Sequence, residues 1–313
     1  MTEERPHKQG GKIEVMRDFT LHVLVKRRYI MPKYGISLLL WTDKFDKESV
    51  KFIHKAAEMG FDGIEIPFFD PETVDIQATK EALKEHNMDC IGCAITSPGR
   101  DLISSDPTEC QTAKDYLREC IEITAKLGGD TLIGPVYSVV GKLVGRSRTD
   151  EEWDLCVKGL KEVAEFAEQH GVTLAIEPIN RFETYFVNTA ADVVNLARDV
   201  DSPYVKVMLD TFHMNIEEKS YRGALECAGD LLYHVHCCEN DRGTPGTGLV
   251  RWDEVFETLA KMNYNRWFVI ESFVPNIEAI AAAAAIWRDI APNAEALATE
   301  GLAFLKRMGE KYL

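Results

Sequence analysis

The sequence lacks a long hydrophobic run. No apolar stretch approaches the roughly 20 residues that a membrane-spanning helix needs. The apolar stretch nearest the N-terminus, FTLHVLV (19–25), is short, contains a histidine and is not followed by a small-residue cleavage site. It therefore does not have the pattern of a signal peptide. We expect a cytoplasmic protein without a membrane partner.

Positive charge is also scarce. Lys and Arg number 36 against 51 Asp and Glu, so the formal net charge is −15. Such a surface repels phosphate backbones, and we do not expect nucleic acid as a partner. The eight cysteines come without an export signal, which predicts free thiols in a reducing compartment. Cys90 and Cys93 form a C-x-x-C inside a strand-like run, where positions i and i+3 face opposite sides, so we do not expect a metal knuckle there.

Short apolar runs that alternate with helical patterns are abundant. Each run is separated from the next by about one βαβ step. The eight runs are 34–41, 63–68, 90–95, 131–136, 172–178, 205–210, 232–237 and 267–272. Eight strands that alternate evenly with helices predict a single (β/α)₈ TIM barrel, because even repetition favours closure. A doubly wound sheet is the alternative.

The intervening stretches have helical periodicity and recognisable ends. The stretches 47–60 and 150–171 end in glycine, and the second begins with acidic residues that suit a helix N-terminus. Stretches 190–200 and 252–263 follow the same rhythm. The tail, 277–292 and 293–308, predicts the last barrel helix and one additional C-terminal helix. Residues 1–30 lack this pattern, so we expect an N-terminal extension, poorly ordered or peripheral, before a catalytic barrel over 31–313.

Polar residues stand at the ends of the last four runs. In a TIM barrel the active site lies at the C-terminal ends of the strands. The residues at these ends are Glu177, Asp210, His236 and Glu271. Four successive strands would therefore aim three carboxylates and one imidazole at a single rim. Mixed oxygen and nitrogen ligands predict one divalent cation per subunit, Mn²⁺ or Co²⁺ by preference and Mg²⁺ as a further possibility.

Other polar features near these runs have simpler interpretations. His234 lies two positions before His236, hence on the same strand face but one layer deeper, which indicates a core histidine. The sequence GTPGTG (243–248) does not connect a strand directly to a helix, so we interpret it as a shaped loop and not as a phosphate loop.

Four stretches of the sequence resemble the ketose 3-epimerases, the group that contains D-tagatose 3-epimerase and D-psicose (D-allulose) 3-epimerase. They are IEPINRFETYFVNTAADVV (176–194), VKVMLDTFHMNIEE (205–218), HVHCCENDRGTPGTG (234–248) and VIESF (269–273). The similarity spans roughly residues 34–310, and the LDTFHMNIEE segment is its most specific part. The resemblance places the chain in the xylose-isomerase-like TIM barrel superfamily.

The resemblance implies roles for particular positions. Residues matching the family's metal ligands are Glu177, Asp210, His236 and Glu271. The two glutamates of this set also match its acid/base pair. Residues matching those that bind the sugar are Glu183, His213, Arg242 and Trp41. The sequence departs from the family around Trp41, where Ser37, Leu38 and Phe45 replace frequent aromatics, and after the fourth run, where Val139 stands near a tryptophan of some members.

The implied reaction inverts carbon 3 of a free ketose of the D-fructose/D-allulose, D-tagatose/D-sorbose or L-ribulose type. It would proceed by deprotonation and reprotonation through a metal-stabilised enediolate, since acid–base help of about 10²–10⁴-fold is not sufficient alone. The resemblance also implies a homodimer or homotetramer. Alternatives on the same metal barrel are an aldose–ketose isomerase, a hydroxypyruvate isomerase or an inosose dehydratase-type lyase. A metal-dependent nuclease and a non-catalytic binding protein are more distant alternatives.

Overall fold

The computed structural model describes residues 1–2 and 32–313 of the chain. The prediction for the extension, residues 1–30, lies outside the described residues except for its first two positions. Residues Pro32–Leu313 form one compact unit, and the fold and the site below belong to it.

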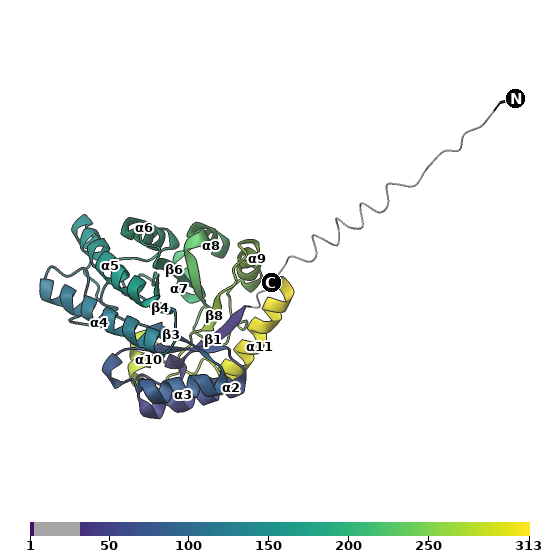
Figure 1. Cartoon of the computed structure of the whole chain (residues 1–313), viewed down its shortest axis with the longest axis horizontal. Helices are drawn as coiled ribbons and strands as arrows, with labels where there is room; N and C mark the ends of the chain where they lie inside the picture. Colours follow the sequence, from purple (N-terminus) through teal and green to yellow (C-terminus); the bar gives the residue numbers. More distant parts are fainter. Residues whose placement is uncertain (3–31) are drawn as a thin grey trace. The chain divides into compact units, whose positions relative to one another are not determined.

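Eight parallel strands close into a barrel in chain order. β1 pairs with β2 on one side and with β8 on the other, where Tyr34 lies opposite Phe268. The strands are β1 Lys33–Ser37, β2 Gly63–Pro67, β3 Asp89–Cys93, β4 Thr131–Gly134, β5 Thr173–Ile176, β6 Val205–Asp210, β7 Leu232–His236 and β8 Trp267–Ile270. Each falls in or next to one of the eight apolar runs. The predicted (β/α)₈ barrel is confirmed, and Figure 1 shows helices surrounding its strands.

The helices follow the strands as the periodicity predicts. The long ones are α2 Lys51–Met59, α3 Ile76–His86, α4 Pro107–Lys126, α5 Asp150–His170, α6 Ala190–Val200, α8 Tyr221–Ala228, α9 Trp252–Lys261 and α11 Ala294–Tyr312. α7 Thr211–Glu217 and α10 Glu278–Ala284 are shorter, and 3₁₀ turns occupy Leu38–Leu40, Lys47–Val50, Pro71–Thr73 and Gly229–Leu231. Gly60 and Gly171 end α2 and α5 with φ values of 87° and 66°, a region that favours glycine.

The inside of the barrel is filled with apolar side chains below the rim. Because side chains alternate along a strand, every second residue points inward. The buried cluster contributed by these strands is Ile91, Cys93, Ile133, Ala175, Met208, Trp267 and Val269. Trp267 needs the space left by glycine: a Cβ on Gly63 would lie 2.6 Å from its ring, and one on Gly35 would lie 3.5 Å away. Apart from buried polar residues such as Glu65 and His234, the inside of the barrel is thus a packed apolar core.

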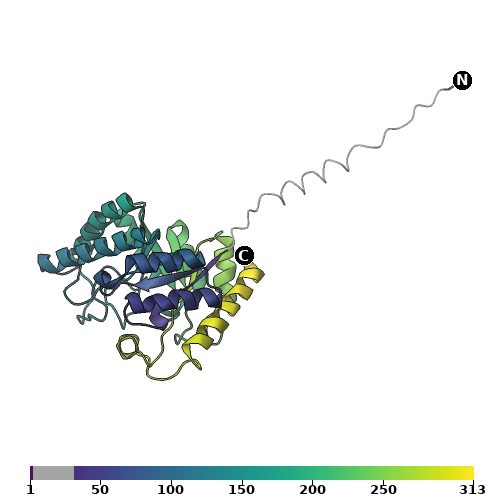
Figure 2. The same ribbon diagram turned by 60° about the horizontal axis from the view of Figure 1, so that its bottom comes forward.

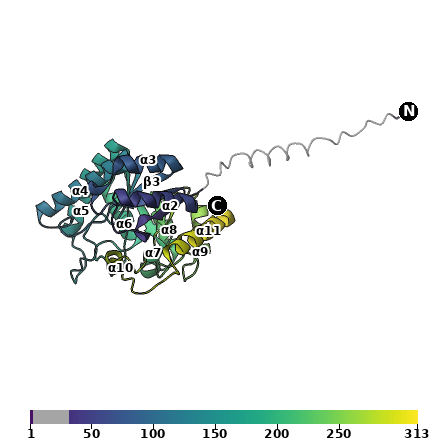
Figure 3. The same ribbon diagram turned by 90° about the horizontal axis from the view of Figure 1, so that it is seen from below.

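The C-terminal region differs from the sequence expectation. The predicted helix over 277–292 ends at Ala284, because Ala285 adopts a left-handed conformation with φ 55°. This turn lets Ile286 pack beside Leu39 and Phe273 in a small buried cluster. Figures 2 and 3 show α10 set apart from the ring of helices, joined by a loop to α11. The predicted additional C-terminal helix is present as α11.

Two further properties of the described residues bear on the sequence expectations. Among these residues, no helix has the length and the apolar character that crossing a membrane requires. All eight cysteines lie in the described part of the chain and are free, as expected. Six of them are buried, Cys110 is partly exposed, and Cys227 on α8 is exposed. Burial raises the pKa of the Cys90 thiol to about 12.

Candidate active site

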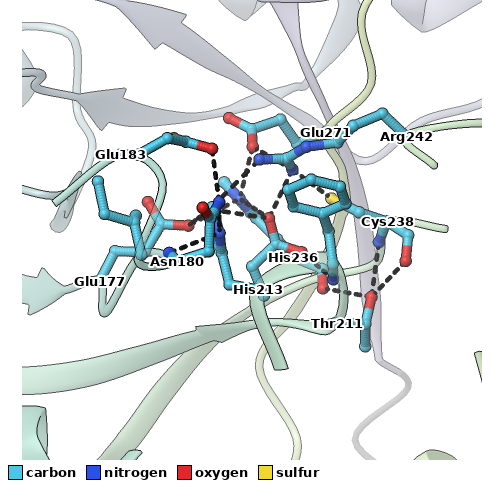
Figure 4. A network of polar contacts seen from close by, with 12 residues as sticks. Glu177, Asn180, Glu183, Thr211, His213, His236, Cys238, Arg242 and Glu271 are labelled. Atoms are coloured by element: carbon cyan, nitrogen blue, oxygen red, sulfur yellow. Dashed lines mark hydrogen bonds and ion pairs between the residues drawn. The ribbon is translucent and has the colours of Figure 1, made fainter. Parts of the chain in front are cut away.

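Four consecutive strands deliver the predicted ligands to one point of the rim. Asp210 and His236 are the last residues of β6 and β7 and lie opposite each other in the strand register. Glu177 and Glu271 follow β5 and β8 by one residue. All four side chains are buried. Figure 4 shows Glu177, His236 and Glu271 grouped around the same space, together with His213 and Arg242.

His236 is at the centre of this group. Its Nδ1 lies 3.5 Å from Glu271 Oε2, 3.8 Å from Glu177 Oε1 and 3.9 Å from Asp210 Oδ2. Nδ1 therefore has one oxygen of each carboxylate within 4 Å. The structure brings together the four side chains that the sequence predicted to share one ion.

Two buried atoms of this group have the properties expected of metal ligands. His236 Nδ1 and Glu177 Oε1 are buried and have no hydrogen-bond partner. Buried polar atoms without partners are rare in folded proteins, and an ion is one of the explanations for them. Three carboxylates and one imidazole are also ligands that Mn²⁺, Co²⁺ and Mg²⁺ accept. The residues present therefore fit a divalent cation, with Glu177, Asp210, His236 and Glu271 as its ligands.

Asp210 uses its two oxygens differently. Oδ1 accepts a hydrogen bond of 2.7 Å from the Phe212 backbone N–H, so that Asp210 caps α7. Oδ2 faces the site and accepts a 2.6 Å hydrogen bond from Arg242 Nη1. The same Nη1 donates to Glu271 Oε2 at 2.8 Å. The buried guanidinium thus compensates the charge of two carboxylates of the site.

His213 is held as a neutral hydrogen-bond donor. The backbone N–H of Asn180 donates to His213 Nδ1 at 3.1 Å, and a backbone N–H cannot reverse this role. The proton of the neutral ring is therefore on Nε2, which lies 3.7 Å from Glu177 Oε1 and 3.9 Å from Asp210 Oδ2. Burial, together with the charges of Arg242 and His236, lowers the pKa of His213 well below its usual value. The same Nε2 also lies 3.3 Å from Arg242 Nη2, so His213 and Arg242 border the site together.

Glu183 approaches the site from the loop after β5. Its Oε1 accepts a 2.6 Å hydrogen bond from the Asn180 side chain, which also contacts His213 Nδ1 at 3.0 Å. Burial raises the pKa of the Glu183 carboxyl, although the charge of Arg242 opposes this effect. Asn180 therefore ties together two of the predicted sugar-binding residues.

The two glutamates of the predicted acid/base pair differ in their electrostatic surroundings. Burial raises the pKa of Glu177 well above its usual value; the charges of His236 and Arg242 oppose this effect, and those of Glu271 and Asp210 add to it. Burial acts in the same direction on Glu271, but the charges of His236 and Arg242 outweigh it and lower its pKa. Arg242 also hydrogen-bonds Glu271 directly, whereas Glu177 Oε1 has no hydrogen-bond partner.

Comparisons with known proteins identify the family. The profile of the family described as "Xylose isomerase-like TIM barrel" matches residues 53–308. The chain belongs to this family, among its ketose 3-epimerases. D-psicose 3-epimerase from Ruminiclostridium cellulolyticum is 35% identical over 276 residues, which cover 84% of this chain and 91% of that enzyme. L-ribulose 3-epimerase from Methylomonas sp. (strain DH-1) is 31% identical over 278 residues, which cover 88% and 97%.

Solved structures show the same relationship. The crystal structure of D-allulose 3-epimerase from Methylomonas sp. in complex with D-allulose matches with a TM-score of 0.85 and 31% identity. The match covers 89% of this chain and 97% of that one. The family resemblance inferred from the sequence is therefore confirmed, and its relatives are carbohydrate epimerases.

A cavity in the barrel of this ketose 3-epimerase family member is lined by residues of the site. Its polar lining consists of Glu177, Glu183, His213, Arg242 and Glu271. The rest of the lining is apolar apart from the Cys93 thiol: Leu39, Phe69, Ile95, Pro135, Val140, Ile179, Phe273 and, from α10, Ile280, Ala283 and Ala284. The cavity therefore has one charged end and one apolar wall.

Trp41 is not part of this lining. Its ring stacks on that of Phe52, with a centroid distance of 5.9 Å and an interplanar angle of 13°. The Lys55 ammonium lies over the Trp41 ring, 5.2 Å from its centroid. The segment after β1 contributes Leu39 to the cavity instead. The sugar-binding role that the resemblance implied for Trp41 has no support in this geometry, because the 3₁₀ turn Leu38–Leu40 directs Trp41 toward α2.

Several residues of the site were not predicted from the sequence. Asn180 is one, and Cys238, whose Sγ lies 3.1 Å from Arg242 Nη1, is another. Thr211 Oγ1 donates to the Cys238 carbonyl at 2.6 Å and accepts from its N–H at 2.8 Å, which ties the ends of β6 and β7 together. Glu65 on β2 contacts His236. A signal for Glu65 was visible, because an acid in the middle of the apolar run GIEIPF needs a buried partner.

Proposed function

We propose that the chain is a ketose 3-epimerase that depends on a divalent cation bound by Glu177, Asp210, His236 and Glu271. The observation that carries the proposal is the unpartnered Nδ1 of His236, buried within 4 Å of three carboxylates. The identity to enzymes named D-psicose 3-epimerase and L-ribulose 3-epimerase supports the reaction type.

Inversion at carbon 3 requires one group on each face of that carbon. Glu177 and Glu271 follow β5 and β8, so they approach the same space from different parts of the rim. One glutamate takes the proton next to the carbonyl, and the other returns a proton to the opposite face. Because an epimerase runs in both directions, the two glutamates exchange these roles when the direction of reaction changes.

The remaining polar residues hold the carbonyl end of the ketose. A divalent cation at this site supplies Lewis-acid stabilisation of the negative charge that develops on the substrate oxygens. Arg242 and the Nε2–H of His213 donate hydrogen bonds toward the same space, and Glu183 accepts from a sugar hydroxyl. The position of these groups along the charged end of the cavity supports the proposed roles.

The apolar wall bears on the choice of ketose. The described residues that line the cavity on that side offer no charged or amide side chain to the distal carbons. Discrimination among hydroxyl configurations requires placed hydrogen-bonding groups, so we expect modest selectivity at the distal end. The substrates to test are therefore D-fructose, D-allulose, D-tagatose, D-sorbose and L-ribulose.

The decisive experiment incubates the purified protein with each ketose and Mn²⁺, Co²⁺ or Mg²⁺ in D₂O and identifies the products by chromatography and NMR. We expect the carbon-3 epimer as the product, with solvent deuterium incorporated at carbon 3. EDTA should abolish turnover, and added Mn²⁺ or Co²⁺ should restore it. Indifference to the chelator, or deuterium only at other carbons, would refute the proposal.

Two variants test the acid/base pair within the same assay. Glu177→Gln and Glu271→Gln should each lower kcat by at least about 10²–10³-fold, because each removes one proton-transfer group. Their circular dichroism spectra should match that of the wild-type protein. Formation of an aldose from one of these ketoses, or loss of water from inosose in a separate incubation, would instead favour the alternative isomerase or dehydratase on this barrel.

We also propose a homodimer or homotetramer as the working form. The loop that carries Glu183 exposes Phe182, and the neighbouring loop exposes Leu143 and Val144. The two loops are joined by a 2.7 Å hydrogen bond from Gly141 N–H to the Glu183 carbonyl. Exposed apolar side chains grouped in this way are typical of protein contacts. Light scattering coupled to size-exclusion chromatography would measure the mass, and a monomer would contradict this part of the proposal.

A further inference from the structure

Glu65 is a carboxylate inside the barrel. It lies at the middle of β2, where Ser37 of β1 and Ile91 of β3 are its register partners, and it is fully buried. Among the described residues, its ion-pair partners are two histidines, His234 and His236, with no Lys or Arg in contact. An unpaired buried carboxylate costs several kcal/mol. The position therefore depends on the two imidazoles.

The contact between Glu65 and His236 determines which ring nitrogen carries the proton. His236 Nε2 lies 3.0 Å from both Oε1 and Oε2 of Glu65. A carboxylate only accepts, so Nε2 must be the donor. In a neutral imidazole the other nitrogen then has a free lone pair. That nitrogen is Nδ1, the unpartnered atom that faces Glu177, Asp210 and Glu271.

The ionisation of Glu65 is consistent with this arrangement. Burial alone would raise the pKa of Glu65, but the neighbouring imidazoles of His236 and His234 lower it to about 2. The geometry agrees with an ionised carboxylate, because Nε2 of His236 and Nε2 of His234 both lie within 3.0 Å of Glu65 Oε1. An ionised acceptor makes a stronger hydrogen bond than a neutral one.

His234 is the second histidine that contacts the Glu65 carboxylate. Its Nε2 lies 2.7 Å from Glu65 Oε1, although not in the direction of a regular hydrogen bond. Its ring packs edge-on against that of His236, with centroids 5.3 Å apart and an interplanar angle of 75°. Both rings project inward from β7, two residues apart. His234 thus limits the positions that the carboxylate can adopt.

We propose that Glu65, supported by His234, is a positioning residue that holds His236 with its proton on Nε2, so that Nδ1 is available to the cation. This inference rests on the proposed function, because it assumes a cation bound at His236. Glu65 itself would not touch the ion or the sugar. Carboxylates that accept a hydrogen bond from a metal-binding histidine orient the ring and increase its basicity as a ligand.

The test compares Glu65→Gln with the wild-type protein. A glutamine can present its NH₂ group to Nε2, which would place the ring proton on Nδ1 and block the ligand atom, as happens when a catalytic histidine is given the wrong tautomer. We expect the Kd for Mn²⁺, measured by calorimetry on EDTA-treated protein, to rise about 10–100-fold. Ring ¹⁵N chemical shifts of the metal-free protein should show a gain of the Nδ1–H form. Unchanged affinity and an unchanged tautomer would overturn the proposal.

A matched control separates positioning from the general effect of changing a buried glutamate. Glu239 is also fully buried, but it accepts hydrogen bonds from the loop at Gly246 and from Trp252 and does not contact His236. Glu239→Gln should therefore leave the Kd for Mn²⁺ within about twofold of wild type, while thermal unfolding in EDTA reports the stability of each variant. An equal loss of affinity in both variants would contradict a specific role for Glu65.

A second variant keeps the proposal testable if Glu65→Gln does not fold. His234→Gln removes the imidazole that packs against Glu65 and leaves the Glu65 carboxylate in place. The Kd of this variant for Mn²⁺ should therefore rise, but by a smaller factor than that of Glu65→Gln. Wild-type affinity in His234→Gln would then refute the inference. Wild-type protein that takes up no ion would instead overturn the proposed function. Two ions per chain would make Glu65 a ligand and not a positioning residue.

Discussion

Arg242 and Asp210 form the shortest ion pair within the site, with 2.6 Å between Nη1 and Oδ2. Arg242 adopts a left-handed backbone conformation with φ 65°, which is uncommon for a residue with a side chain. The conformation follows the hydrogen bond from its N–H to the Glu239 carbonyl. Backbone strain of this kind is found where a side chain must be aimed at a functional site.

Removal of the Arg242 charge should destabilise the protein in a metal-dependent way. Arg242→Gln leaves the carboxylates of Asp210 and Glu271 without the guanidinium that pairs with them, and breaking a buried ion pair costs about 3–5 kcal/mol. In EDTA we expect a loss of this size in urea unfolding, and a smaller loss in Mn²⁺, which neutralises the same carboxylates. Arg181→Gln is the control, because Arg181 also pairs with a carboxylate, that of Glu217, but its side chain is largely exposed. Equal losses of unfolding free energy with and without Mn²⁺ would contradict the idea that Arg242 and the metal ion neutralise the same carboxylates.

The Asn180 side chain should affect substrate binding more than metal binding. Asn180→Ala removes the 2.6 Å hydrogen bond to Glu183 but keeps the backbone N–H that sets the tautomer of His213. A lost hydrogen bond to a charged group corresponds to about 1.5 kcal/mol. We expect KM to rise roughly tenfold, with kcat and the Kd for Mn²⁺ nearly unchanged. A fall in Mn²⁺ affinity would show that the side chain supports the metal site instead.

Gly134 should be intolerant of any side chain. Its φ is 130°, and an added Cβ would lie 2.1 Å from the Ala94 carbonyl oxygen. The Gly134 carbonyl also accepts the N–H of Glu177 at 3.1 Å. Gly134→Ala should therefore lower the free energy of unfolding by at least about 3 kcal/mol and impair turnover. Gly128→Ala is the control: its φ is 88° with nothing within 4 Å, so only a strain of about 1 kcal/mol is expected.

Glu152 should contribute to stability in a pH-dependent way. Hydrogen bonds from Arg146, from the Thr149 N–H and from Tyr185 lower its pKa to about 2 despite its partial burial. Because the folded pKa lies below the unfolded value of about 4.3, the stabilisation is present above that value and is lost as the pH falls toward 2. Glu152→Gln should be less stable by about 1 kcal/mol at pH 7 and equal to wild type near pH 2. Glu151→Gln, in the same helical turn but exposed, is the matched control.

Much of the fold and of the rim could be predicted from the sequence, for a physical reason. Strands that are buried on both faces appear as apolar runs, and a charge at the end of such a run marks the rim. Because Asp210 and His236 end neighbouring strands in register, their meeting followed from the spacing alone. The same rule located Glu177 and Glu271. The sequence could not show that Nδ1, and not Nε2, of His236 faces the three carboxylates, since Nε2 is taken up by Glu65, which lies 171 positions away in the chain.

Loop geometry limited the rest of the prediction. The direction of Trp41 depends on a 3₁₀ turn of three residues, which has no distinctive pattern in the sequence. The end of α10 at Ala284 depends on the burial of Ile286, a tertiary contact. Periodicity alone continued that helix to 292, because alanine is the best helix former and signals no stop.

The distribution of the thiols has a practical consequence for spectroscopy on this protein. Burial raises the pKa of Cys93, Cys156 and Cys238 well above the usual value, so these groups remain protonated and shielded from alkylating reagents. Cys227 is exposed on α8. A maleimide fluorophore should therefore attach at Cys227 first, which gives one reporter on the outer surface of the barrel without a cysteine-free background.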